Sequence, residues 1–156
     1  MARRVLVVDD DAAVRSTLAQ LLERTGFEVM EAANGKVAMR QMSRESADLV
    51  VIDMLMPEME GAETIFGLRR FFPGVRIIAV SGGGLCSAEA HLQIARALGS
   101  DKILSKPLIP DEFLNAVREM IGEAKTRRKW VRLEQNLNTR SLASPSVAFR
   151  LASISG

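Results

Sequence analysis

The sequence has few of the residues on which disulfide-stabilised proteins and histidine-dependent sites rely. Its 156 residues include one cysteine, Cys86, one histidine, His91, and no tyrosine. A single cysteine excludes an internal disulfide and a cysteine-based zinc site. One histidine argues against a histidine metal cluster and against a Ser-His-Asp triad. We therefore interpret Cys86 as an ordinary thiol and His91 as a solvated helical residue.

Long apolar runs are missing as well. No run approaches the roughly 18 residues that a membrane-spanning helix needs. The N-terminus, MARRVLVVDDD, joins two arginines to an apolar segment, but three aspartates follow too soon for a signal peptide. With 47% hydrophobic and 26% charged residues, the chain is expected to be globular, cytoplasmic and without a membrane span.

The net charge of +2 conceals an asymmetry between two parts of the chain. Residues 1–124 carry 14 basic and 18 acidic residues, whereas residues 125–156 carry 7 basic residues and one acidic residue. The excess of basic residues therefore belongs to the C-terminal segment, and it gives no reason to expect nucleic-acid binding by the rest of the chain. We predict one domain over residues 1–124, followed by a basic, disordered tail over residues 125–156.

The tail leaves an alternative open. The segment KTRRKWVR at its start is interpreted as a solvated extension of the last helix, although a DNA-associated transcriptional regulator could use it to contact DNA. Such binding would depend steeply on salt and would vanish on removal of residues 125–156. About 30 residues is too short for an ordinary DNA-binding output domain, so nucleic acid is not an expected partner.

Apolar runs alternate with segments of helical periodicity along the first 124 residues. Strands are expected at Val5–Val8, Phe27–Ala32, Asp48–Ile52, Val75–Val80 and Lys102–Leu104. Helices are expected at Ala12–Thr25, Lys36–Arg44, Glu63–Phe72, between Gly84 and Gly99, and from Pro110 onward. This order predicts a parallel sheet with helices on both faces. The continuous apolar strands should be central, and the alternating Phe27–Ala32 should lie at an edge.

Polar residues stand at the ends of these strands. In LVVIDMLMPEMEG, Leu49–Gly61, an apolar run ends at one carboxylate, Asp53, and the loop signals Pro57 and Gly61 follow. Because ligands bind beyond the carboxyl ends of parallel strands, we expect the polar residues there to converge. The residues in question are Asp9, Asp10, Asp53, Ser81 and Lys106.

The residue types indicate phosphoryl chemistry. Several carboxylates cannot comfortably share a site as bare anions, and three acids without a nearby histidine or thiol suit Mg²⁺ or Mn²⁺. Asp53, held at a strand end, can then act as a nucleophile toward phosphorus. Lys106 supplies a second positive charge. The Ser81 hydroxyl can donate to a phosphoryl oxygen that is present only after transfer.

The motifs VLVVDDD, IDMLMPEMEG, AVSGG and LSKP, in this order, closely resemble the receiver domain of two-component response regulators. The resemblance runs from Arg4 to about Glu123. It implies a flavodoxin-like (βα)₅ fold with strand order 2-1-3-4-5. It also implies that Asp53 accepts a phosphoryl group from a histidine kinase or phosphotransfer protein in a signalling module that is not an enzyme beyond its own phosphorylation and dephosphorylation. An unidentified downstream protein and a phosphorylation-dependent dimer are compatible with it.

The resemblance assigns further roles by motif position. Asp9, Asp10 and Asp53 would bind the metal with the backbone carbonyl of Leu55. Ser81, Gly82 and Lys106 would bind the phosphoryl group and act as the switch. The Lys106–Pro107 peptide is expected to be cis.

Three positions depart from the family pattern. Ile103 stands where an aromatic switch residue is usual, so output is expected to depend on shifts of the backbone around Ser81. Leu55 and Gly83 flank the expected path of the hydrolytic water and should set the lifetime of the phosphorylated state. The run Gly82–Gly84 is either a hinge or a tolerant surface loop.

Other functions fit the sequence less well. An aspartate-nucleophile phosphohydrolase would need an acid at the position of Leu55. A degenerate receiver is disfavoured because all five site residues are present. A flavin or nucleotide binder would need a Gly-rich loop where DDDAAVR stands. Asp11 is interpreted as a helix cap. Methionines 54, 56 and 59 are interpreted as packing residues.

Overall fold

The computed structural model of the chain describes residues 2–57, 60–82 and 88–123. The strands are β1 (Arg4–Val8), β2 (Glu28–Ala32), β3 (Leu49–Asp53), β4 (Arg76–Ser81) and β5 (Lys102–Ser105). The helices are α1 (Ala12–Arg24), α2 (Gly35–Arg44), α3 (Glu60–Phe71), α4 (Ala88–Leu98) and α5 (Pro110–Ile121). Strand and helix thus alternate along the described chain in the predicted order.

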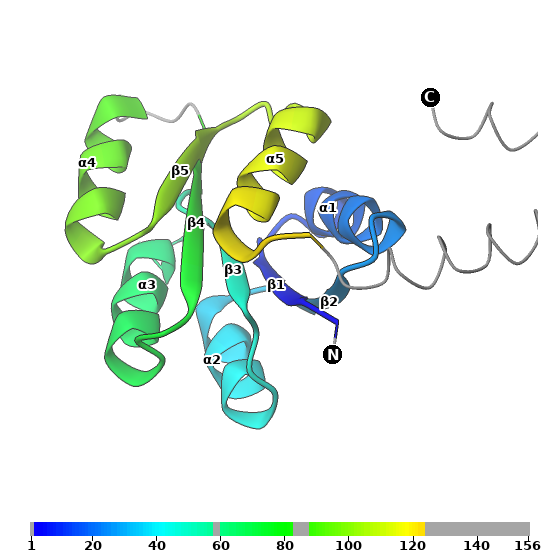
Figure 1. The fold of residues 1–156 in the computed structure, drawn as a ribbon. Helices are drawn as coiled ribbons and strands as arrows, with labels where there is room; N and C mark the ends of the chain where they lie inside the picture. The colour runs from blue at the N-terminus through cyan, green and yellow to red at the C-terminus, as the bar shows by residue number, and fades with distance from the viewer. Residues whose placement is uncertain (1, 58–59, 83–87, 124–156) are drawn as a thin grey trace, which may run out of the picture. The chain divides into compact units, whose positions relative to one another are not determined.

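The strands form a single parallel sheet in the order β2-β1-β3-β4-β5 (Figure 1). This is the predicted flavodoxin-like topology. The apolar strands β1, β3 and β4 are central and almost wholly buried, whereas β2 lies at an edge and is only partly buried, with Glu28 and Glu31 exposed and Ala32 buried. The predicted distinction between central and edge strands is confirmed.

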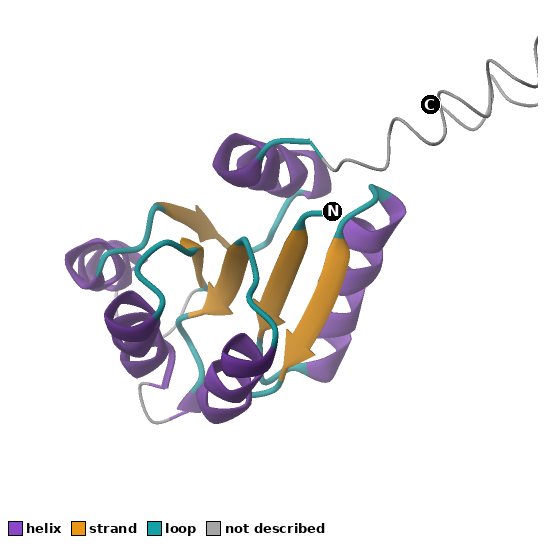
Figure 2. Cartoon of the chain, turned by 60° about the horizontal axis from the view of Figure 1, so that its bottom comes forward, coloured by secondary structure: helices purple, strands orange, loops and turns teal. Residues whose placement is uncertain are grey.

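Alternate residues of each central strand enter two separate cores, because successive side chains of a strand point to opposite faces of the sheet. Val5 and Val7 of β1 pack with α1 and α5, whereas Leu6 and Val8 pack with α2, α3 and α4. Phe113 of α5 is fully buried in the first core. Figures 1 and 2 show the resulting three layers, with the sheet between the two groups of helices.

Caps and close contacts set helix boundaries that periodicity did not fully predict. Asp11 caps α1 as expected, accepting from the backbone N–H groups of Ala13 and Val14. The Asn34 side chain accepts from the N–H of Val37, so α2 begins at Gly35, one residue before the predicted start. The helix α3 begins at Glu60, three residues before the expected residue 63.

The sequence had suggested that Gly61 lies in a loop, and this prediction is wrong. Gly61 lies in the first turn of α3. A Cβ atom at this position would lie 2.6 Å from the carbonyl oxygen of Asp53 and 3.0 Å from Cα of Met54. Glycine here permits close packing of the helix on the end of β3. Gly61 is thus needed because two backbone segments approach closely there, and not because the chain turns.

Some predictions concern residues outside those described. They include the tail over residues 125–156, Cys86, Met59, and the loop glycines 83 and 84. The side chain of His91 is likewise not described. Within the described part of the chain, no helix is both long enough and apolar enough to cross a membrane.

Candidate functional site

The carboxyl edge of the sheet brings together the acids that the sequence singled out. Asp9 follows β1 and Asp53 ends β3, so the pairing of these neighbouring strands places their carboxylates side by side. One carboxylate oxygen from each of Asp9, Asp10 and Asp53 lies within 4.8 Å of the others. Asp9 and Asp53 are buried, whereas Asp10 is exposed. The cluster is therefore rooted in the sheet and open to solvent on one side.

Asp53 is held by contacts to both of its carboxylate oxygens. Oδ1 accepts from the backbone N–H of Leu55 at 2.9 Å, and Oδ2 accepts from the ammonium of Lys106, also at 2.9 Å. The side chain is 5% exposed. These contacts fix the orientation of a carboxylate that the end of a buried strand already positions.

Lys106 is the basic group of the cluster. Its Nζ lies 3.6 Å from Oδ2 of Asp9 in addition to its bond with Asp53. Burial lowers the pKa of Lys106, but the hydrogen bond and charge of Asp53, together with the charge of Asp9, outweigh that effect and raise the pKa above its ordinary value. Lys106 is therefore protonated at neutral pH. Its backbone N–H donates to the carbonyl of Ser81, and its peptide bond to Pro107 is cis.

Burial and neighbouring charges together shift the pKa of the Asp9 carboxyl group upward. Burial is the main cause that raises its pKa, and the charges of Asp53 and Asp10 raise it further. A hydrogen bond from the N–H of Asp11 and the charge of Lys106 act in the opposite direction without cancelling the rise. One ammonium does not balance three carboxylates, so a divalent cation would relieve this repulsion.

The donor set of the cluster fits such a cation. It consists of carboxylate oxygens from the three acids, which are hard ligands of the kind that Mg²⁺ prefers. The exposed side chain of Asp10 leaves access for water, and Mg²⁺ usually keeps several water ligands in proteins. These residues could therefore hold a magnesium ion.

Ser81 and Gly82 form the part of the rim next to Lys106. The hydroxyl oxygen of Ser81 is buried and has no hydrogen-bond partner in the described structure, so it is free to donate to an incoming acceptor. A Cβ atom at Gly82 would lie 3.2 Å from Cδ of Lys106 and 3.3 Å from Cδ1 of Leu55. Gly82 therefore allows these two side chains to lie against the backbone beside Asp53.

Ile103 lies on β5, paired with Ala79 of β4. Its side chain is half-buried and packs against the core beneath α2, α3 and α4. The methionines of the loop after Asp53 also pack as expected, since Met54 and Met56 are buried in that core.

One residue near the cluster was missed by the sequence analysis. Arg15 of α1 donates from Nη1 to the carbonyl oxygen of Asp9 at 2.8 Å, and its Nε lies 3.3 Å from Oε1 of Glu31. Its position six residues after Asp9 follows no helical or strand period, because the intervening chain turns at the cap. Only the fold shows this contact.

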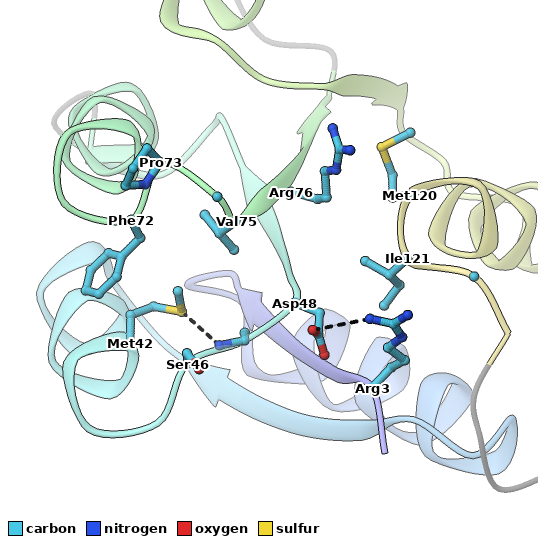
Figure 3. Close-up of a pocket in the computed structure, with 13 residues that line it drawn as sticks. Arg3, Met42, Ser46, Asp48, Phe72, Pro73, Val75, Arg76, Met120 and Ile121 are labelled. Carbon is cyan, nitrogen blue, oxygen red and sulfur yellow. Dashed lines mark hydrogen bonds and ion pairs between the residues drawn. The ribbon is translucent and has the colours of Figure 1, made fainter. Parts of the chain in front are cut away.

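A pocket of about 650 Å³ lies at the opposite, amino edge of the sheet (Figure 3). Its walls include Met42, Phe72 and Ile121, and the carboxylate of Asp48 lies 3.6 Å from Nη1 of Arg3 at its rim. The Asp48 carboxylate also accepts from the backbone N–H of Arg4 at 2.8 Å, which ties the start of β1 to the start of β3. The charged groups of this pocket thus join neighbouring strands, and none of the candidate site residues lines it.

Comparisons with known proteins agree with this geometry. The family model of the response regulator receiver domain matches residues 5–118. The chain is 34% identical over 123 residues to the chemotaxis protein CheY of Bacillus subtilis, covering 78% of this chain and 100% of that protein. It is 29% identical over 121 residues to sporulation initiation phosphotransferase F of the same organism, covering 78% and 95%.

A solved structure gives the same result. The CheY-like receiver domain protein from Methanospirillum hungatei JF-1 superposes with a TM-score of 0.69 at 29% identity, covering 76% of this chain and 93% of that one. The two chains therefore share the same fold. The chain belongs to the response regulator receiver domain family of two-component signalling.

Proposed function

We propose that the chain is a phosphorylation-controlled signalling module in which Asp53 accepts a phosphoryl group from a phosphohistidine of a histidine kinase or phosphotransfer protein. The observation that carries this proposal is the buried Asp53 carboxylate, bonded to Lys106 and grouped with two further acids at the edge of the sheet. Mg²⁺ is the proposed cofactor, with Asp9, Asp10, Asp53 and the Leu55 carbonyl as its ligands.

In the proposed transfer, an oxygen of the Asp53 carboxylate attacks phosphorus as the bond from phosphorus to the donor imidazole nitrogen breaks. The imidazole leaves with the bonding pair and takes up a proton, and Asp53 becomes an acyl phosphate. The bonds from the Leu55 N–H and from Lys106 hold the carboxylate in a fixed orientation, so little rotational freedom is lost on reaction. Bound Mg²⁺ would neutralise the charge of the phosphoryl oxygens.

Lys106 and Ser81 are the groups through which the phosphorylated state would be recognised. Lys106 can transfer its hydrogen bond from the Asp53 carboxylate to a phosphoryl oxygen, which carries more charge. The Ser81 hydroxyl, which has no hydrogen-bond partner among the described residues, would gain an acceptor when the phosphoryl group is present. Because both residues are linked by the bond from the Lys106 N–H to the Ser81 carbonyl, their movement would shift the ends of β4 and β5 together.

The same proposal covers the organisation of the chain. Residues 1–124 would form the receiver domain and residues 125–156 a basic tail for which nucleic acid is not the expected partner. The module would work in the cytoplasm by presenting an altered surface to a downstream protein or to a second copy of itself. A phosphohydrolase remains disfavoured, since the side chain of Leu55 supplies no acid or base for turnover.

The test is whether acetyl phosphate with Mg²⁺ adds one phosphoryl group to the full chain, and whether this addition needs Asp53. Intact mass measures both. A chain that gains no mass under these conditions, or that gains it with Asp53 replaced, contradicts the proposal.

Replacing Asp9 with asparagine should stabilise the metal-free protein. A raised carboxyl pKa means that the folded state disfavours the ionised form, so stability is greatest below the unfolded pKa and falls as the pH rises through the folded value. At pH 7 asparagine removes this cost while its amide oxygen can still accept from the Asp11 N–H. We expect the free energy of unfolding in EDTA to rise by about 0.5–2 kcal/mol, measured by urea denaturation.

The same pair of proteins reports on the metal. Mg²⁺ at 100 times its dissociation constant should stabilise the wild type by about 2.7 kcal/mol, because it binds only the folded state. Asp9→Asn should gain much less at the same concentration. Equal stabilisation of both proteins by Mg²⁺ would exclude Asp9 as a ligand.

Replacing Leu55 with asparagine should change the lifetime of the phosphorylated state. Leu55 lies beside Gly82 at the rim, where its side chain borders the proposed approach of the hydrolytic water to the acyl phosphate. An amide in its place can hydrogen-bond that water, so we expect a faster loss of the phosphoryl group, by about tenfold. Dephosphorylation is followed by intact mass after removal of the donor, with Ile103→Val as a control outside this path. An unchanged rate refutes the assignment.

A further inference from the structure

Arg15 holds the peptide that joins two of the proposed metal ligands. Its guanidinium donates to the carbonyl oxygen of Asp9, which belongs to the peptide plane between Asp9 and Asp10. The arginine side chain is only 18% exposed, and its Nε is paired with Glu31 beside the end of β2. The guanidinium thus links the backbone at Asp9 to Glu31 of the edge strand β2, with a different nitrogen in each contact.

Asp9 and Asp10 differ in how their carboxylates are restrained. The backbone N–H of Asp9 donates to the carbonyl of Ala32, and its carboxylate accepts from the N–H of Asp11. The carboxylate of Asp10 is exposed and makes no hydrogen bond or ion pair with the part of the chain that the structure describes. The orientation of the Asp9–Asp10 peptide therefore decides where the Asp10 carboxylate lies relative to the other two acids.

From these contacts we infer that Arg15, oriented by Glu31, is a positioning residue for the divalent-cation site. It fixes the Asp9–Asp10 peptide plane, and so keeps the Asp10 carboxylate within reach of Asp9 and Asp53. The inference rests on the proposed function, because it concerns the cation of that same site.

The charge of Arg15 and its positioning contact predict opposite effects on Mg²⁺ affinity when the residue is replaced. This difference makes the inference testable. A guanidinium close to the site repels a cation, so removal of its charge alone would strengthen Mg²⁺ binding. Loss of the bond to the Asp9 carbonyl releases the peptide plane, and the loss of such supporting contacts commonly weakens metal binding by about 10- to 100-fold. Weaker binding in the absence of the arginine charge therefore cannot come from the lost charge, and a control variant separates lost positioning from general destabilisation.

The chain offers a matched control at the other end of the same two strands. Arg4 starts β1 and forms an ion pair with Glu28 at 3.0 Å, just as Arg15 pairs with Glu31 near the ends of the same strands. Replacement of Arg4 with methionine removes the same charge and a comparable ion pair. It does so at the amino edge of the sheet, away from the acidic cluster.

The experiment measures Mg²⁺ affinity by isothermal titration calorimetry, and stability by urea denaturation in EDTA, for the full chain and its variants. We expect Arg15→Met to weaken Mg²⁺ binding about tenfold, whereas Arg4→Met should stay within about twofold of the wild type. Arg15→Lys keeps the charge and one donor and should recover part of the affinity. If Arg15→Met does not fold, Glu31→Gln provides a second test. This variant keeps Arg15 but removes the carboxylate charge that orients its guanidinium. It should weaken binding by about threefold, and Glu28→Gln is its control.

The outcomes separate the inference from the proposed function. An Arg15→Met or Glu31→Gln protein that binds Mg²⁺ as tightly as the wild type, or more tightly, overturns the positioning role alone. An equal loss of affinity in Arg4→Met overturns it too, because the loss would then follow general destabilisation. A wild-type protein that binds no Mg²⁺ contradicts the proposed metal site itself.

Discussion

Replacing Asp53 with asparagine is expected to abolish the gain of one phosphoryl group from acetyl phosphate and Mg²⁺. The amide keeps the size of the side chain and can still accept from the Leu55 N–H, but it is not a nucleophile at neutral pH. The loss should therefore be complete on the time scale on which the wild type reacts. Intact mass before and after incubation measures the result.

The control for this variant is an acid close to the site that serves a different purpose. Asp11 follows Asp10 and caps α1 through its side chain, and asparagine caps a helix about as well as aspartate. Asp11→Asn should be phosphorylated like the wild type. Removal of Mg²⁺ with EDTA should prevent phosphorylation of both the wild type and Asp11→Asn. Phosphorylation of Asp53→Asn at the wild-type rate would place the acceptor elsewhere and refute the central proposal.

Replacing Gly61 with alanine should cause a large loss of stability. The new Cβ would lie 2.6 Å from the carbonyl oxygen of Asp53, which is backbone and cannot rotate away. Either α3 or the end of β3 must shift, and overpacking of this kind costs up to about 3 kcal/mol. Alanine recovers up to about 1 kcal/mol through its better helix propensity. We expect a net decrease in the free energy of unfolding of about 2 kcal/mol, measured by urea denaturation.

Gly74→Ala provides the matched control, because a Cβ at Gly74 meets nothing within 4 Å. Its free energy of unfolding should stay within about 0.5 kcal/mol of the wild type. Since the clash at Gly61 is with Asp53, the proposed phosphoryl acceptor, Gly61→Ala should also be phosphorylated more slowly by acetyl phosphate. A Gly61→Ala protein as stable as Gly74→Ala would show that α3 can move away from β3 freely.

The contrast between these two glycines shows where reasoning from the sequence stops. Gly61, like Pro57, was interpreted as a loop signal after the strand that ends at Asp53. Its real reason, the approach of α3 to the Asp53 carbonyl, involves two elements that local patterns do not place relative to each other. The start of α2 at Gly35 was likewise not given by periodicity. It depends on the conformation of Asn34, whose side chain caps the helix.

The sequence by itself determined the class of fold, a parallel sheet with helices on both faces, and the residues expected at the candidate site, whereas the strand order 2-1-3-4-5 was expected only from the resemblance to receiver domains. Continuous apolar strands such as Leu49–Asp53 can be buried on both faces only in the middle of a parallel sheet, and parallel strands all end at the same edge. Asp9, Asp53 and Lys106 were therefore expected at the same edge of the sheet. How near to one another they lie depends on the strand order β2-β1-β3-β4-β5, which the period and order of elements along the chain do not give.

The tertiary structure alone decided how the site is held. Two contacts, from Lys106 to the Asp53 carboxylate and from Arg15 to the Asp9 carbonyl, depend on side-chain directions at separate strand ends. So does the burial of the Ser81 hydroxyl, which has no partner among the described residues. Residue type and spacing constrain which groups come near, but distances of a few ångströms follow from how helices and strands pack. That packing involves all the elements at once, so no single stretch of sequence encodes it.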